Sequence, residues 1–299
     1  MTGTRPCRSA GHPTNVDWQH MRVIVLGTHL YPASGAAADR MWSAVDTWTR
    51  LAGVHLVNLQ FADDPCPVLH PAFETRPVLL HDSRTITGIQ GPRKPIVREV
   101  LDCLVNAARE TGCAYAGFSN ADIRISEGAA SRVMDGGHEA VAFSRMDIDT
   151  KTAAPLGEFF SGQDTLFVQP GAYRRVRPRL HPYIVGEMPW DVIYTSILLT
   201  HLRAELVNRG DDCQHVRHDA IWVDSPFAQH GWRLADMDWT YFARWYRYYE
   251  EAKRLRAAGR PAAEEDAVRR RVFGPLSIGE RAKNGYRAIR YRVHHGRPQ

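Results

Sequence analysis

A strand, a helix and a second strand between residues 21 and 61 restrict the possible folds more than any other part of this sequence. An apolar run at 23–26 predicts a buried strand, and residues 41–51 repeat apolar side chains on one face of a helix. Alternation over 54–61 predicts the second strand. Because strands joined by a helix pair in parallel with a right-handed crossover, the opening predicts an α/β fold. It contains no GxGxxG, so it does not indicate a dinucleotide-binding fold of that kind.

The rest of the chain continues to alternate helices and strands. Residues 62–95, rich in Pro, Asp and His, predict a long irregular passage, and a helix is expected from there to Glu110. A strand then begins at Tyr115. The later segments predict a short helix at 129–134, a strand at 140–144, a polar loop at 148–161, a strand after 164, a helix at 187–206, helices at 239–258 and 262–273, and a frayed tail to the end.

The composition is typical of a soluble globular protein, with 44% hydrophobic and 24% charged residues. A chain of 299 residues can bury a large core in one big domain or two small ones. No apolar run is long enough to cross a bilayer, and the polar N-terminus lacks the apolar segment of a secretory signal. We expect a disordered leader at 1–20, the main α/β domain at 21–237 and a basic helical C-terminal extension at 238–299.

The cysteines indicate a reducing compartment. There are five of them, an odd number, and no CxxC pair occurs. This usage argues against a disulfide framework and against a structural zinc site. We therefore expect a cytoplasmic protein.

The net charge of +5 is concentrated at the C-terminus. Residues 241–299 hold 15 Lys/Arg and 6 Asp/Glu, whereas the preceding 240 residues hold 23 and 27. Such a tail can contact an anionic membrane surface or a protein, or it can be a solvated helical face. The aromatic and basic segment 239–249 suits a peripheral helix at the inner membrane face or a protein-docking helix, unless its aromatics pack on the core. The sequence carries no strong nucleic-acid signal.

An apolar run from Tyr115 that ends in Asn120-Ala121-Asp122 is the strongest candidate for a functional strand end. A carboxylate at the carboxyl end of a strand lies where open α/β sheets place their ligands. A buried charge needs a partner, and a metal cation is one candidate. The alternative is that Asp122 caps a helix or pairs with Arg124.

Four later residues could join Asp122. Asp164 precedes an apolar strand, and Asp191 lies in a first helical turn, where the helix dipole favours a carboxylate in any case. His215 and His218 are three residues apart. Each alone is more often a cap, a turn former or a surface residue. Together they could form a divalent-metal site with a carboxylate base, because Mg²⁺ and Mn²⁺ are bound by carboxylates together with substrate phosphates.

From about residue 21 to 232, the order of these elements resembles the GT-A family of nucleotide-sugar glycosyltransferases. The resemblance implies a GT-A-like, Rossmann-type mixed sheet flanked by helices. It also implies transfer of a sugar from a nucleoside-diphosphate sugar to a hydroxyl of a glycan or small-molecule acceptor. In that family a DxD motif at a strand end holds the metal and the donor diphosphate. Here Asn120 replaces the first Asp, and the lost charge predicts weaker binding of a Mn²⁺ or Mg²⁺ cofactor.

The resemblance also assigns roles to individual residues. Asp122 matches the metal-binding carboxylate, and His218 or His215 matches a late metal-ligating histidine. Asp191 is the first candidate for the base that deprotonates the acceptor, and Asp164 is the alternative. Candidates for contacts with the nucleotide, by position, are Thr28, His29, Arg93, Lys94, Asn120 and Asp122.

Two other functions use the same residues. A metal-dependent phosphoesterase or nuclease would take water as the nucleophile and use the basic tail to grip nucleic acid. A non-catalytic protein with a nucleotide-sugar fold would instead bind a partner through its basic C-terminal helices.

Overall fold

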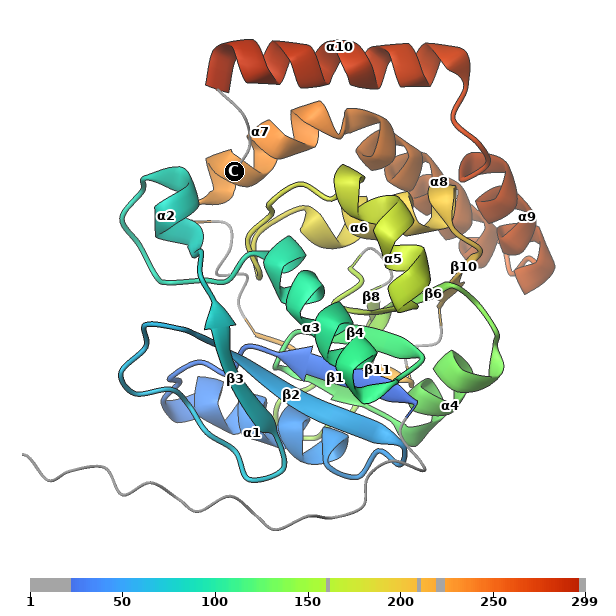
Figure 1. Ribbon diagram of the computed structural model, residues 1–299. Coiled ribbons are helices and arrows are strands. Elements are labelled where there is room, and N and C mark those ends of the chain that lie inside the picture. The colour runs from blue at the N-terminus through green and yellow to red at the C-terminus, as the bar shows by residue number, and fades with distance from the viewer. Residues whose placement is uncertain (1–22, 160–161, 209–210, 219–223, 296–299) are drawn as a thin grey trace, which may run out of the picture.

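Two β-sheets lie at the centre of the protein, and helices pack around them (Figure 1). The computed structural model describes residues 23–159, 162–208, 211–218 and 224–295. The strands of the larger sheet are, in order across it, β10 (Ala204–Val207), β6 (Ala140–Phe143), β9 (Thr165–Val168), β4 (Tyr115–Ser119), β1 (Ile24–Thr28), β2 (Val54–Phe61) and β3 (Glu74–Leu79). Strand β9 is antiparallel to both neighbours, and the other neighbouring pairs are parallel. The predicted class, an α/β protein with a mixed sheet flanked by helices, is confirmed.

Alternate side chains of every strand except the edge strand β3 enter two hydrophobic clusters, one on each face of this sheet. In β1, Val25 belongs to one cluster, while Ile24 and Leu26 belong to the other. The Ile24 side is covered by α1 (Gly35–Trp48) and α4 (Glu127–Asp135), and the Val25 side by α3 (Val97–Thr111), α5 (Pro170–Val176) and α6 (Trp190–His201). Both faces are buried, as expected for strands with nearly continuous apolar runs.

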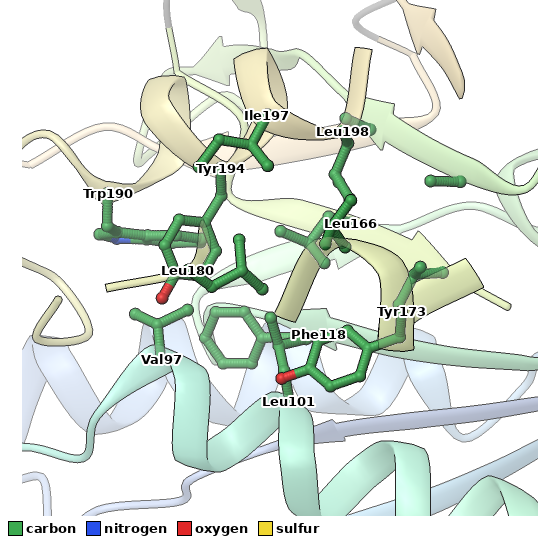
Figure 2. Packing of buried hydrophobic residues seen from close by; sticks show 14 of the residues in the cluster. Val97, Leu101, Phe118, Leu166, Tyr173, Leu180, Trp190, Tyr194, Ile197 and Leu198 are labelled. Atoms are coloured by element: carbon green, nitrogen blue, oxygen red, sulfur yellow. The ribbon is translucent and has the colours of Figure 1, made fainter. Parts of the chain in front are cut away.

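Close packing on the Val25 side depends on a small residue and on large aromatic rings. Gly27 of β1 is required because a Cβ there would lie 2.2 Å from a methyl carbon of Leu104 in α3. On the same side, the Phe118 and Trp190 rings meet edge to face with centroids 5.5 Å apart (Figure 2). Such a pair adds about 0.5–1.5 kcal/mol beyond the area it buries. Trp190 is 2% exposed, so its ring is part of the core.

The strand, helix and strand predicted at the start of the chain form β1, α1 and β2, with Ile24 paired in parallel to Val54. Other predicted segments were wrong. The irregular passage contains β3 and α2 (Ser83–Thr87). The polar loop predicted at 148–161 contains β8 (Pro155–Phe159), which forms a hairpin with β7 (Arg145–Ile148). The helix predicted to continue to 206 ends at His201, and strand β10 follows it. The prediction was too long because a continuous apolar run does not show where a helix ends and a strand begins.

A second, four-stranded sheet has the order β5 (Ile123–Ile125), β11 (Cys213–Val216), β7 and β8. Strand β11 pairs antiparallel with β5 and parallel with β7. Because β5 follows β4 after three residues, this small sheet begins where the larger one ends.

The C-terminal region consists of helices α7 (Ala228–Met237), α8 (Trp239–Ala257), α9 (Ala262–Val272) and α10 (Ile278–His295). The prediction of a frayed tail was therefore wrong over α10. Helices α8 and α9 belong to the same core as the sheet, and Tyr241, Trp245 and Tyr248 of α8 are buried there. The aromatic side chains of α8 thus pack mainly inward. No described helix is long and apolar enough to cross a membrane. The leader predicted at 1–20 lies outside the described residues.

Candidate functional site

The carboxyl ends of several strands meet at one edge of the larger sheet. Strand β1 lies between β2 and β4, so the chain changes direction across the sheet at β1, and ligands of open α/β sheets bind outside such a switch point. Because β9 is reversed, its first residue, Thr165, pairs with Ser119 and Phe143 at the ends of β4 and β6. Residues that follow β4 and β6 and those that precede β9 are therefore brought together.

Strand pairing also brings the two histidines to this edge. β5 begins directly after Asp122, and its first residue, Ile123, pairs with His215 of β11. His218 follows β11 by two residues. Asp122 and the two histidines thus come together although they are more than 90 residues apart in the chain.

Asp122, His215 and His218 form a compact group of potential metal ligands. Oδ2 of Asp122 lies 3.4 Å from Nε2 of His218 and 3.5 Å from Nε2 of His215. One ligand atom from each residue falls within 4.8 Å of the others. The His215 side chain is buried, and the Asp122 side chain is 25% exposed, so a ligand can reach the carboxylate from solvent.

The charges in this group support one another. Burial acts to raise the pKa of Asp122, but hydrogen bonds from His215 and His218 outweigh it and hold the pKa well below its usual range. Burial likewise acts to lower the pKa of His215, and hydrogen bonds to Asp122 and Asp147 outweigh it and raise the pKa to about 9. The ionised carboxylate is ready to bind a cation, which would displace a proton from His215.

Asp147 of β7 orients His215. Its Oδ1 lies 3.0 Å from Nδ1 of His215, which leaves Nε2 directed toward Asp122. A carboxylate behind a histidine fixes the tautomer and orientation of a metal ligand. The arrangement fits a divalent cation held by two imidazoles and one carboxylate, a donor set that suits Mn²⁺ better than Mg²⁺.

A second group of charges is centred on Asp164. Its carboxylate pairs with Arg145 and accepts a hydrogen bond of 2.8 Å from Nδ2 of Asn120. Arg145 also lies 3.2 Å from Asp147, so the two groups are connected through this arginine. Asn120 is therefore positioned to hold Asp164, while Asp122 two residues later faces the histidines.

Asp191 lies at the start of α6, next to Asp164. Burial and the negative charge of Asp164 raise the pKa of Asp191 to about 7, although backbone amides of Val192 and Gln163 act in the opposite direction. Oδ1 of Asp191 is buried and has no hydrogen-bond partner among the described residues. A carboxyl with this pKa can exchange a proton near neutral pH.

Four of the six residues predicted to contact a nucleotide lie in other surroundings. Thr28 and His29 are buried at the end of β1, and Nδ1 of His29 lies 2.8 Å from the carbonyl oxygen of Leu59. Arg93 pairs with Asp82 and Asp63, and its guanidinium stacks on Phe61. Lys94 lies 2.6 Å from Oε1 of the buried Glu187. Both cations are thus already paired with carboxylates of this chain.

Sequence reasoning missed three residues of this region. Arg145 and Asp147 lie on β7, for which no strand was predicted. Tyr31, which follows β1, is partly exposed, and burial together with the charge of Asp122 raises its pKa, so its phenol lies within the field of that carboxylate. A signal that could have found β7 is the alternation of Arg145, Asp147 and the intervening apolar Met146.

The comparisons with known proteins found distant structural likeness only. No family model and no curated protein matches the sequence. Among solved structures, residues 1–349 of TarS from S. aureus match with a TM-score of 0.39 and 10% identity, covering 92% of this chain and 91% of that one. A mannosyltransferase from Pyrobaculum calidifontis, solved with GDP-Man and Mn²⁺, matches with a TM-score of 0.36 and 12% identity, covering 93% of this chain and 76% of that one. At these levels of similarity, function has to be inferred from the site itself.

Proposed function

We propose that this protein is a metal-assisted glycosyltransferase that moves a sugar from a nucleoside-diphosphate sugar to an acceptor hydroxyl. The observation that carries the proposal is the group of Asp122, His215 and His218 outside the switch point of the sheet. An anionic diphosphate bound at this edge of the sheet would need a cation, and these three side chains supply a ligand set for one.

Asp122, His215 and His218 would hold the ion, with Mn²⁺ preferred over Mg²⁺ because two of the donors are imidazoles. A cation there would neutralise the charge that develops on the diphosphate leaving group. Asp147 keeps Nε2 of His215 available through the contact at Nδ1.

Asp191 is the better candidate for the catalytic base. Asp164 is ion-paired with Arg145 and accepts a hydrogen bond from Asn120, so both of its oxygens are engaged within the protein. Asp191 has a pKa of about 7, which suits it to accept the proton of an acceptor hydroxyl. In this mechanism Asp164 acts on Asp191 through its charge and does not touch the substrate.

Calorimetric titration with UDP- and GDP-sugars, each with and without Mn²⁺, tests the proposal. We expect one donor class to bind more tightly with Mn²⁺, and Asp122→Asn to abolish the metal-dependent part. Asp135→Asn, which changes an exposed carboxylate at the end of α4, is the matched control and should bind as the unmodified protein does. Failure of every nucleotide sugar to bind, together with no effect of Asp122→Asn on Mn²⁺ binding, would refute the proposal.

Turnover separates the base from the binding residues. With a binding donor in hand, Asp191→Asn should keep donor affinity and lower the transfer rate by about 10²–10⁴-fold, the usual contribution of a general base. Equal loss of donor affinity and rate would instead assign Asp191 to binding.

The donor set also favours a second candidate, a metal-dependent phosphoester hydrolase. Two histidines and one carboxylate leave coordination positions in which a cation can activate water. Release of p-nitrophenol from bis-p-nitrophenyl phosphate, dependent on Mn²⁺ and on Asp122, would select this reaction. Sugar transfer without comparable release would select the first.

A further inference from the structure

Helix α10 lies across the outer side of the C-terminal helices, over α7 and α8 (Figure 1). Its inner side is firmly attached. Ala288 and Tyr291 pack against the core, and the guanidinium of Arg287 lies 5.8 Å from the centre of the Trp239 ring. Glu280 pairs at 2.9 Å with the buried Arg244 of α8. The orientation of α10 is thus fixed by contacts along its length.

The outer side of α10 is apolar although it faces solvent. Ile278, Tyr286, Ile289 and Val293 are 82%, 67%, 61% and 74% exposed. Their positions, separated by eight, three and four residues, fall on one stripe of an α-helix, and Ala282 continues that stripe between the first two. Single exposed apolar residues are normal on a surface, but a continuous apolar stripe on an outer helix indicates an interaction site. We call this set the outer stripe of α10.

Cations border the outer stripe on both sides. At 100° per residue, Arg281 lies beside one edge, and Lys283 and Arg290 lie beside the other; all three are exposed. The acidic residue of this helix, Glu280, is directed inward to Arg244. The outer side of α10 therefore combines apolar side chains at its centre with positive charge at its margins.

We propose that the outer stripe of α10 docks this protein on an anionic lipid surface, with the helix lying in the plane of the membrane interface. An apolar stripe bordered by Lys and Arg is the pattern of helices that bury one side at the boundary between headgroups and acyl chains. The apolar side chains enter that boundary, and the cations reach the phosphates on either side. Because the inner side of α10 stays packed against the domain, docking leaves the fold unchanged.

Charge distinguishes this occupant from the others. Two copies of α10 placed face to face would bring Arg281, Lys283 and Arg290 of each against the same cations of the other. A nucleic acid would engage the cations but gain nothing from Ile278, Ile289 and Val293. An anionic bilayer is complementary to both parts of the surface.

Co-sedimentation of the full chain with vesicles tests the proposal. We expect binding to phosphatidylcholine vesicles that contain phosphatidylglycerol, little binding to phosphatidylcholine alone, and weaker binding as salt is added. Ile289→Glu should abolish binding, and its matched control is Leu80→Glu, which adds the same charge at an exposed leucine in another region of the surface. The double variant Arg281→Gln with Arg290→Gln should weaken binding on the order of tenfold. Its control is Arg50→Gln with Arg174→Gln.

Thermal unfolding and sedimentation velocity of each variant accompany the assay, so that misfolding is recognised. All six substituted residues are exposed, and unchanged melting temperatures are expected. Binding that is equal for neutral and anionic vesicles, or that the two control variants lose as strongly as the α10 variants, would overturn the proposal. So would a dimer in solution that Ile289→Glu dissociates while no vesicle binding occurs, because the stripe would then be an interface between copies.

Discussion

The buried carboxyl of Asp191 makes a quantitative prediction about stability. Its pKa is raised from an ordinary value of 3.8 to about 7 by burial and by the charge of Asp164. A carboxyl whose pKa is higher in the folded state than in the unfolded state stabilises the folded state while it is protonated. This contribution is lost as the pH rises through about 7. Ionised Asp191 therefore destabilises the fold at alkaline pH.

Replacing Asp191 by Asn removes the ionisable group and keeps its shape. A shift of about three pK units corresponds to at most about 4 kcal/mol, at ~1.4 kcal/mol per unit. We expect the Asn variant to gain stability relative to the unmodified protein progressively from about pH 4 to about pH 7, above which the gain levels off at a few kcal/mol. The gain should come with loss of transfer, as is common where a functional site is strained.

Urea unfolding followed by tryptophan fluorescence, at several pH values across this window, measures the effect. Asp135→Asn serves as the control, because that carboxylate is exposed and its replacement should leave the difference near zero at every pH. A stability difference between Asp191→Asn and the unmodified protein that does not change with pH would refute the reasoning. That result would mean that the pKa of Asp191 is the same in the folded and unfolded states.

Three further predictions concern the metal group and α10. Asp147→Asn should lower Mn²⁺ affinity by about 10–100-fold, because the carboxylate orients His215; titration calorimetry checks this. Because the pKa of His215 is raised to about 9, Mn²⁺ binding should release protons and tighten as the pH rises toward that value, which titrations in buffers of different ionisation enthalpy detect. Arg244→Ala should leave Glu280 without its buried partner, and faster amide hydrogen exchange confined to α10 is the expected result, whereas faster exchange throughout the core would contradict it.

Much of the larger sheet could be predicted because its strands are buried on both sides. Continuous apolar runs such as 23–26 and 115–118 are distinctive, and turn residues mark where they end. The edge strand β3 and the hairpin of β7 and β8 were missed, because exposed strands carry polar residues and, in β3, a proline. Helix α10 was missed for a related reason, since its apolar stripe faces outward and Gly279 and Gly285 interrupt the pattern.

The proposed site shows a similar division. Asp122, His215 and His218 could be selected from the sequence because a strand that ends in a carboxylate and two closely spaced histidines are local patterns. The contact between His215 and Asp147 depends on the pairing of β11 with β7, which no local pattern specifies. The prediction that Arg93 and Lys94 contact a nucleotide rests on their position in the sequence alone. Their partners Asp63, Asp82 and Glu187 are apparent only in the fold.

The reversed strand β9 has a consequence for cooperativity. It lies between β4 and β6, so the pair β6 and β10 is joined to the rest of the sheet through β9. Asp164, directly before β9, meets Arg145 after β6 and Asn120 after β4 only when this strand is in place. The pairing of β9 in the sheet and the assembly of the charged group centred on Asp164 therefore occur together. Amide protons of β9 should accordingly exchange only when the whole domain unfolds, and the protein should have no stable state in which the sheet is complete but this group is not.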